Sequence, residues 1–371
     1  MQDLIHHFNS DIGYILNKTL DQERLDYQDC VNLFHSDDFF NIGLIANILR
    51  NKLYKNSATF VNNIILNYTN VCITNCKFCA FYRPPKHNES YTLSKEQILQ
   101  RISLSKKMYG ITQVLFQGGH NPHLGVEYYE EIFKETKKLH PDISIHGLSA
   151  SEIDNISKVD NSSIKEILSR LKDAGLDSLP GAGAEILVDD VKNKISPLKI
   201  KSNEWLKIME YAHNLNIKSS ATMMYGTVEN NDDIIQHLIK IRDLQEKTGG
   251  FLAFIPWGFE PNNTQMQLDG LTRYSPGGYK LLKMIAISRI IFYNLIPHIQ
   301  SSWLTNGIGM AQLALTFGAD DFGGTLIGEE VVSATGARST ELNSSSIIES
   351  IKQIGYIAAE RDNFYNILRV F

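Results

Sequence analysis

The feature that most constrains the fold of this chain is a regular alternation of two kinds of segment, which begins near residue 59. Short apolar runs rich in β-branched residues predict strands, and the longer amphipathic stretches between them predict helices. The predicted strands are Phe60–Leu66, Gln113–Phe116, Ile143–Leu148, Ser178–Pro180, Ser219–Tyr225, Phe251–Pro256, His298–Trp303 and Asp321–Gly323. The predicted helices include Ser94–Met108, Glu127–Leu139, Ile164–Ala174, Asn203–Leu215, Asp232–Lys247, Gly278–Tyr293 and Ile308–Phe317.

Eight strands alternating with helices are what a (β/α)8 TIM-type barrel requires, and such barrels typically take about 250 residues. A doubly wound sheet is the alternative, but it usually has fewer strands. The first predicted helix opens with a capping box formed by Ser94 and Gln97. We therefore predict an α/β protein with an N-terminal helical extension (1–57), a (β/α)8 barrel (58–338) and a C-terminal helical segment (339–371) packed on the outside.

Composition and charge narrow the class of ligand. The 371 residues carry a formal net charge of −5 and contain no block of Lys or Arg, whereas nucleic-acid binding depends on clustered cations. The most apolar stretch, Leu281–Pro297, is interrupted by Lys283 and Arg289, and a membrane span needs about 20 mostly apolar residues. The N-terminus lacks the basic and apolar regions of a signal peptide. We expect a cytoplasmic protein that acts on a small molecule and binds neither nucleic acid nor membrane.

Three of the four cysteines, Cys72, Cys76 and Cys79, fall within eight residues directly after the first predicted strand. In a reducing compartment such clustering indicates a metal rather than disulfides. The spacing CxxxCxxC suits a [4Fe–4S] cluster in which one iron has no protein ligand, and Phe78 would shield it from water. A zinc site is the alternative, although zinc prefers a fourth tight ligand. The remaining cysteine, Cys30, is expected to be a buried, inert thiol.

This loop resembles that of the radical S-adenosylmethionine (SAM) superfamily, whose members carry it after the first strand of a barrel. The resemblance implies that SAM binds the open iron and is cleaved to a 5′-deoxyadenosyl radical. It also implies a glycine-rich turn after the second strand that contacts the methionine end of SAM. The matching residues are Gln117, Gly118 and Gly119, with His120 where an acidic residue is common. Glycines there allow the backbone to approach the ligand closely.

Further segments resemble the enzymes of the futalosine pathway to menaquinone and of deazaflavin biosynthesis. These segments are Cys79–Arg83, Gln117–Pro122, Leu179–Leu187 and Ala221–Gly226. Within that group, four others are most similar to the cyclic dehypoxanthine futalosine synthases: Thr248–Trp257, His298–Trp303, Asp320–Gly324 and Glu329–Gly336.

The resemblance implies a radical ring closure that converts dehypoxanthine futalosine into its cyclic form. The deoxyadenosyl radical takes the hydrogen from C4′ of the ribose, and the resulting carbon radical adds to the benzoate ring. Loss of one electron and one proton then restores aromaticity. An electron donor such as flavodoxin or ferredoxin would reduce the cluster. The alternatives are an aminofutalosine synthase or deazaflavin (FO) synthase-like radical SAM enzyme and, from another class, a non-catalytic zinc-binding protein.

Several side chains suit this chemistry by their position in the pattern. Glu185, in a glycine-rich segment, and Ser149, just past the third strand, are candidates to contact SAM, and Glu185 is also a catalytic candidate. Alternation places His298 and Gln300 on one polar face of their strand. We expect both near the barrel mouth, with His298 as the first candidate for the base and Gln300 as a catalytic or substrate-binding group.

The remaining substrate-binding candidates are Arg83, Tyr225 and Trp257. Arg83 follows the cysteine loop and could pair with a carboxylate of SAM or of the substrate. Tyr225 and Trp257 end their strands, where barrel enzymes place their active sites, and could wall the aromatic substrate. The structural alternatives are a solvated arginine and two ordinary core aromatic residues.

Overall fold

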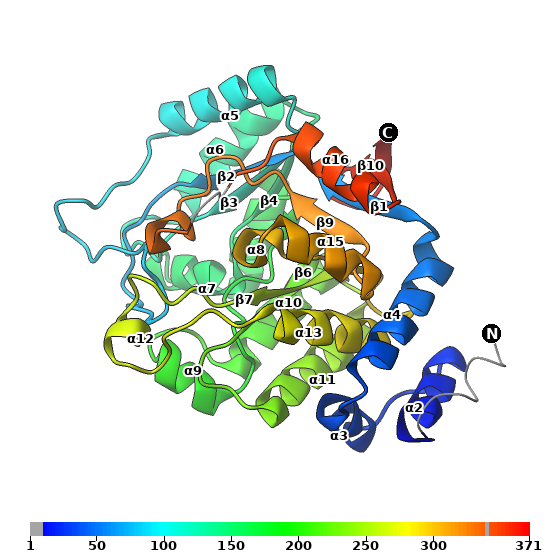
Figure 1. Cartoon of the computed structure of the whole chain (residues 1–371). Helices are drawn as coiled ribbons and strands as arrows, with labels where there is room; N and C mark the ends of the chain where they lie inside the picture. Colours follow the sequence, from blue (N-terminus) through cyan, green and yellow to red (C-terminus); the bar gives the residue numbers. More distant parts are fainter. Residues whose placement is uncertain (1–9, 338–340) are drawn as a thin grey trace.

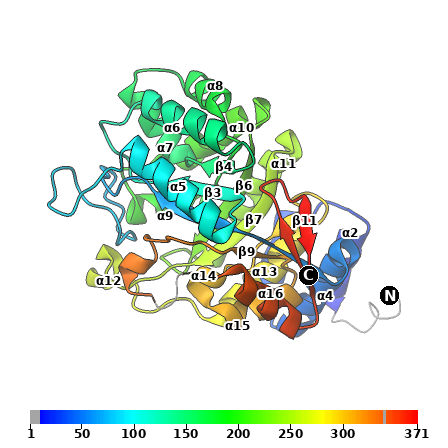
Figure 2. The same cartoon turned by 90° about the horizontal axis from the view of Figure 1, so that it is seen from above.

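The computed structural model describes residues 10–337 and 341–371, which form a parallel β-barrel surrounded by helices (Figures 1 and 2). The barrel strands are β1 (Ser57–Val61), β2 (Asn63–Asn67), β3 (Gln113–Gln117), β4 (Ser144–Gly147), β5 (Ser178–Leu179), β6 (Lys218–Tyr225), β7 (Phe251–Gly258), β8 (His298–Ile299) and β9 (Asp321–Gly324). Every predicted strand overlaps one of these, and the first is divided into β1 and β2 at Asn62.

The strands close into a ring. Strands β2 to β8 form one parallel sheet in sequence order. Strand β9 pairs in parallel with β1, with Asp321 opposite Thr59, and a bridge between Gln300 and Asp321 joins β9 to the residue that follows β8. Because β1 leads directly into β2, these pairings connect the two edges of the sheet. The predicted (β/α)8 architecture is confirmed.

Helices follow the strands and pack outside the barrel. They are α5 (Lys95–Tyr109), α6 (Val126–Leu139), α7 (Ala150–Val159), α8 (Ile164–Ala174), α9 (Asp189–Ile195), α10 (Ser202–Asn214), α11 (Asn231–Thr248), α12 (Gln265–Leu268), α13 (Gly278–Ile291), α14 (Trp303–Asn306) and α15 (Ile308–Thr316). The capping box predicted at the start of α5 is present: the Ser94 amide donates to Gln97 Oε1 at 2.8 Å, and the Gln97 amide donates to Ser94 Oγ at 3.3 Å. Because the two bonds satisfy amides that lack helical partners, they fix where α5 begins.

Within the described residues, the barrel is preceded by the helices α2 (Ser10–Leu20), α3 (Tyr27–His35) and α4 (Phe39–Tyr54). Helix α4 packs against α13, and α3 packs against α11. On α4 the buried residues Ile42, Ile45 and Leu49 recur at helical spacing, so one apolar face of the extension is buried. Cys30 in α3 is fully buried, and burial raises the pKa of its thiol to about 11, as expected of an unreactive cysteine.

The C-terminal segment differs from the helical segment predicted for 339–371. Helix α16 (Ser344–Gln353) is present, but the chain then forms β10 (Ile357–Arg361), parallel to β1, and β11 (Ile367–Val370), antiparallel to β10. The helical prediction is therefore wrong after Gln353, because β1 supplies hydrogen-bond partners that lie far away in the sequence. The predicted boundary between residues 338 and 339 lies outside the described residues.

Strand β8 is shorter than the predicted strand His298–Trp303. The backbone of Ser302 has a left-handed φ of 56°, and its hydroxyl donates to the carbonyl oxygen of Pro256. Trp303 then begins α14. A left-handed residue cannot continue the extended backbone, so the strand ends before it.

Among the described residues, no helix combines the length and the apolar character needed to cross a membrane.

Candidate active site

The three clustered cysteines lie at the mouth of the barrel, the end where the carboxyl ends of the strands meet. Thr74 Oγ1 lies 3.0 Å from Cys72 Sγ and 3.4 Å from Cys76 Sγ. All three cysteines line one cavity at this end of the barrel. Burial raises the pKa of Cys76 to about 12 and also raises that of Cys79. Thiolates at this position therefore require a compensating positive charge, which bound metal ions provide.

We call the cavity around the cysteines the cluster pocket; it contains about 910 Å³ of empty space. Its lining includes the three cysteines and every residue predicted to contact the cofactor: Phe78, Gln117, Gly118, Gly119, Ser149 and Glu185. Within residues 10–337 and 341–371, no three His, Cys, Asp or Glu side chains are grouped to hold one metal ion.

The turn after β3 can be built only with glycines. A Cβ on Gly118 would lie 2.6 Å from the ring of Tyr68, and a Cβ on Gly119 would lie 2.2 Å from the carbonyl oxygen of Val71. Val71 directly precedes the first cysteine, so the glycine turn packs against the cysteine loop. The two segments that the sequence singled out therefore form one wall of the cluster pocket.

Glu152, which the sequence analysis did not select, holds this wall in place. Its carboxylate is buried and accepts hydrogen bonds from the amide of Gly118 at 2.9 Å, the amide of Ser149 at 2.7 Å and the hydroxyl of Tyr68 at 2.8 Å. Ser149 caps α7, because its hydroxyl accepts from the Glu152 amide at 3.2 Å. The Ser-x-x-Glu pattern of a capping box was the available sequence signal for Glu152.

Glu185 lies in the cluster pocket but is already paired with two lysines. Its carboxylate accepts from Lys192 Nζ and from Lys199 Nζ, each at 2.9 Å. Burial opposes its ionisation, but the charges of Lys192 and Lys199 prevail and lower the pKa of Glu185 to about 2. Two ammonium groups facing one carboxylate leave one positive charge in excess. Neither lysine was predicted, since both lie in the segment after the glycine-rich turn and carry no motif.

Lys199 brings that excess charge toward the cysteines. It lines the cluster pocket, and its Nζ lies 5.5 Å from the ring centroid of Phe78. Burial opposes the charge on Lys199, but Glu185 and then the nearby Cys76 raise its pKa. The pocket thus offers thiols for a metal cluster together with a fixed cation that suits an anionic group.

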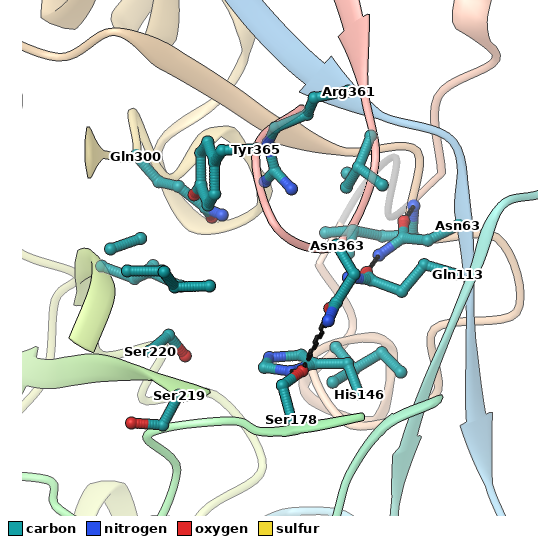
Figure 3. Close-up of a pocket in the computed structure, with 17 residues that line it drawn as sticks. Asn63, Gln113, His146, Ser178, Ser219, Ser220, Gln300, Arg361, Asn363 and Tyr365 are labelled. Atoms are coloured by element: carbon teal, nitrogen blue, oxygen red, sulfur yellow. Dashed lines mark hydrogen bonds between the residues drawn. The ribbon is translucent and has the colours of Figure 1, made fainter. Parts of the chain in front are cut away.

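Two further cavities lie deeper in the barrel than the cluster pocket. The first, the mouth pocket, shares Gln117, Thr222 and Trp257 with the cluster pocket. The second, the inner pocket, is shown in Figure 3. It shares His146 and Gln300 with the mouth pocket and lies on the side away from the cysteines. The three cavities are therefore adjacent in the barrel interior. The predicted substrate-binding residue Trp257 borders the cluster and mouth pockets, and Gln300 borders the mouth and inner pockets.

Two predicted substrate-binding residues lie elsewhere. Arg83 borders none of these cavities; it donates to Glu89 at 2.6 Å and to the carbonyl oxygen of Tyr82 at 2.9 Å. Its guanidinium therefore braces the end of the cysteine loop. Tyr225 is fully buried and lines none of the three cavities, so it belongs to the core, which was its structural alternative.

The position predicted for His298, near the mouth, is wrong. His298 is the first residue of β8 and pairs with Ala253, close to the start of β7, so it lies at the opposite end of the barrel. Its Nδ1 is 2.6 Å from Asp320 Oδ2, and its ring stacks on Tyr365 at 3.7 Å. Strand alternation does not give the height of a residue in the barrel, and the register of β8 against β7 sets it here.

Comparison with known proteins connects this geometry to a family. The profile described as the radical SAM superfamily matches residues 66–241, and the profile described as the CofH/MqnC C-terminal region matches residues 248–370. The chain is 40% identical to the cyclic dehypoxanthine futalosine synthase of Streptomyces coelicolor, covering 97% of this chain and 90% of that one. The chain belongs to the radical SAM superfamily.

Two other relatives carry two different names, those of a synthase and of a transferase. The cyclic dehypoxanthine futalosine synthase of Halalkalibacterium halodurans is also 40% identical, covering 97% of this chain and 96% of that one. The 5-amino-6-(D-ribitylamino)uracil–L-tyrosine 4-hydroxyphenyl transferase of Methanococcus aeolicus is 39% identical, covering 92% and 95%. The membership makes the protein an enzyme and overturns the alternative of a non-catalytic zinc-binding protein.

Solved structures of radical SAM enzymes share the fold. Methylornithine synthase (PylB) superposes with a TM-score of 0.72 at 17% identity, covering 92% of this chain and 96% of that one. The hydrogenase maturase HydG gives a TM-score of 0.76 at 14% identity, covering 96% and 78%.

Radical SAM enzymes use a [4Fe–4S] cluster and SAM, and the residues of the cluster pocket fit both groups. Cys72 and Cys76, which are buried, and the partly buried Cys79 line one pocket and offer the soft ligands that iron–sulfur clusters require. The glycine turn, which tolerates no side chain, and the cation of Lys199 suit the backbone and carboxylate contacts of an amino-acid group.

Proposed function

We propose that this radical SAM enzyme converts dehypoxanthine futalosine into cyclic dehypoxanthine futalosine in menaquinone biosynthesis. The observation that carries the proposal is the match to two synthases of that name, each 40% identical over 97% of the chain. The matches extend over nearly the whole length of the chain, and so include the segments that line the mouth pocket as well as the cysteine loop.

Residues at different levels of the barrel have different roles in this proposal. Cys72, Cys76 and Cys79 hold the cluster, with Phe78 as its cover. The turn Gln117–Gly119 receives the amino-acid end of SAM, and Lys199 supplies a positive charge to its carboxylate or to the thiolates. When bound, the cluster and SAM together supply a primary-carbon radical that removes one hydrogen atom from the substrate.

The substrate occupies the mouth pocket below SAM. Trp257 borders both the cluster pocket and the mouth pocket, where its ring can lie against an aromatic substrate. Gln300 borders the mouth pocket and the inner pocket and can hydrogen-bond a polar group of the substrate. A pocket walled by barrel strands keeps C4′ and the benzoate ring near each other and away from water, as a radical ring closure requires.

Two remaining roles belong to the same proposal. Glu185 orients Lys192 and Lys199 rather than reacting itself, since both of its oxygens are engaged by lysines. An electron donor such as flavodoxin or ferredoxin reduces the cluster, and the enzyme works in the cytoplasm.

A second candidate is the transfer of a tyrosine-derived group to 5-amino-6-(D-ribitylamino)uracil. The 39% identity to the Methanococcus aeolicus transferase over 92% of the chain favours it. Both reactions begin with radical generation at the same cluster, so they differ only in what the mouth pocket accepts.

The test uses the full chain with its cluster reconstituted under anaerobic conditions, supplied with SAM and a reductant. One reaction receives dehypoxanthine futalosine deuterated at C4′, and another receives tyrosine plus 5-amino-6-(D-ribitylamino)uracil. We expect only the first to react, to give a product that has lost one hydrogen from C4′ and one from the ring, with the deuterium in 5′-deoxyadenosine. A tyrosine-derived adduct in the second reaction, with no turnover in the first, would replace this proposal with the transferase.

A further inference from the structure

The lower part of the barrel interior contains polar groups at a level where such barrels are normally packed with branched apolar residues. TIM-type barrels usually fill their centre with layers of Val, Ile and Leu. Here the lining of the inner pocket includes polar side chains, among them Gln113, Ser178, Ser219 and Ser220 (Figure 3), beside branched apolar ones such as Leu115 and Leu326. Polar groups therefore replace part of the apolar packing here, which indicates a function for them.

His146 on β4 is the histidine that faces this space. It borders both the mouth pocket and the inner pocket. Its partners in the sheet are Leu115 on β3 and Ser178 on β5. Gln117, which borders the cluster pocket, lies two residues beyond Leu115 on the same strand. At about 3.3 Å per residue, His146 lies roughly 7 Å below the level of Gln117.

One ring nitrogen of His146 is held by a chain of hydrogen bonds, and the other is free for chemistry. Nδ1 lies 2.6 Å from Ser178 Oγ, and Ser178 Oγ lies 3.1 Å from Asn363 Oδ1. Asn363 comes from the connection between β10 and β11 and also accepts from Gln113 Nε2 at 2.7 Å (Figure 3). With hydrogen on Nδ1, that nitrogen donates to Ser178, and Nε2 is an acceptor with no hydrogen-bond partner among the described residues.

We propose that His146 is the base that removes the ring proton in the last step of the ring closure. This inference rests on the proposed function. After hydrogen abstraction, C4′ forms a carbon–carbon bond to the benzoate ring. The ring carbon that gains this bond then breaks its bond to hydrogen: the proton goes to Nε2 of His146, and one electron leaves to a one-electron acceptor of the iron–sulfur class. The substrate thereby loses two hydrogens in total and its ring is aromatic again.

The protonation state of His146 agrees with this role. Burial, and next the charge of Arg361, lower the pKa of His146 to about 3, so its imidazole is neutral at neutral pH. Such an imidazole is a weak base, but the ring proton is strongly acidic because its loss restores aromaticity. His298, the other candidate, is separated from the cavity by Tyr365, on which it stacks.

The decisive variant is His146→Gln, with His35→Gln, an exposed histidine on α3, as the matched control. In assays with C4′-deuterated substrate, His146→Gln should still move deuterium into 5′-deoxyadenosine at a near wild-type rate. Formation of the cyclic product should fall by roughly 10²- to 10⁴-fold, the usual contribution of a general base, and uncyclised or unaromatised material should appear. His146→Ala should regain cyclic product when imidazole is added.

Two results would overturn the inference. One is wild-type formation of cyclic product by His146→Gln. The other is loss of deuterium transfer from His146→Ala with no rescue by imidazole, which would make His146 a packing or binding residue. Neither result is confused with failure of the proposed function, because in that case the wild-type enzyme itself would not convert dehypoxanthine futalosine.

Discussion

The charge of the cluster pocket is determined by three side chains, Glu185, Lys192 and Lys199. The three side chains bury two positive charges and one negative charge, with side-chain exposures of 4%, 1% and 14%. Lys192 also donates to the carbonyl oxygens of Gly183 and Ala184 at 2.8 and 3.2 Å. Each charge depends on the others, because an isolated buried ion would be strongly disfavoured.

Replacement of Glu185 by Gln should therefore destabilise the protein. Two buried ammonium groups would lose their counter-charge. Removal of one partner from a buried ion pair typically lowers the free energy of unfolding by about 3 to 5 kcal/mol. Denaturant unfolding of the two proteins would measure the loss. Glu131→Gln is the matched control, since its ion pair with Lys95 is exposed and should contribute little. Equal stability of Glu185→Gln and the wild type would contradict the buried network.

The cysteines give a second prediction at this scale. Alanine at Cys72, Cys76 or Cys79 should prevent cluster binding and SAM cleavage, because each thiol would be the only protein ligand of one iron. Cys30→Ala should leave both intact, since Cys30 lies buried in α3. Iron content and the visible absorbance of the reconstituted proteins are the measurements. Full iron and activity in Cys76→Ala would refute the proposed ligand set.

At the scale of elements, the cluster pocket depends on two connections that interlock. The turn after β3 packs its glycines against Tyr68 and Val71 of the cysteine loop. The start of α7 adds Glu152, whose carboxylate ties the turn to the helix. Burial raises the pKa of Glu152, while its three hydrogen bonds favour the charged form. The loop, the turn and the helix thus fix one another.

Gly119→Ala should therefore disturb the site as well as stability. Its new methyl group would meet the carbonyl oxygen of Val71 at 2.2 Å, and such overpacking usually costs about 1 to 3 kcal/mol. The cysteine loop would have to shift, so SAM affinity should fall along with the melting temperature. Gly309→Ala on α15 is the control, because nothing lies near its added Cβ. Unchanged SAM affinity in Gly119→Ala would show that the contact is not needed.

At the scale of the whole molecule, the two ends of the barrel are formed by different parts of the chain. The cysteine loop lies on one side in Figures 1 and 2, and the C-terminal strands lie on the other. At that lower end, Arg361 donates to Asp321 at 3.2 Å, and Asn363 and Tyr365 line the inner pocket. Residues 361–365 therefore cover the lower end of the barrel interior, whereas the segment near residue 72 lies at its mouth.

The assembled barrel also buries neutral histidines, which makes its stability sensitive to acid. His237 is fully buried, and burial followed by the charges of Lys192 and Lys240 lowers its pKa to about 3. The unfolded chain takes up a proton below about pH 6.5 and the folded chain does not, so the free energy of unfolding falls as the pH drops from about 6.5 toward 3.

His237→Gln should reduce this acid sensitivity. Each such histidine contributes a slope of about 1.4 kcal/mol per pH unit between those two pKa values. Urea unfolding of wild type and variant at several pH values between 4 and 7 should therefore show a shallower slope for the variant. Identical slopes would mean that His237 is protonated in the folded protein.

The sequence by itself determined the features that depend on neighbours along the chain. The alternation of segments predicted the barrel, because the periods of strands and helices are local properties. The cysteine spacing and the turn Gln117–Gly119 located the cluster pocket, since a loop that wraps a cofactor uses residues close in sequence. Ser94 and Gln97 marked the start of α5 for the same reason.

Tertiary structure alone decided which distant residues meet and at what height. His298 was expected near the mouth, but its place at the start of β8 puts it at the barrel floor. His146 and Lys199 face the cavities through strand register and a folded loop, neither of which has a local signature. The C-terminal strands form only because β1 offers an edge about 300 residues earlier. Long-range pairing depends on closure of the whole ring, which no short stretch of sequence encodes.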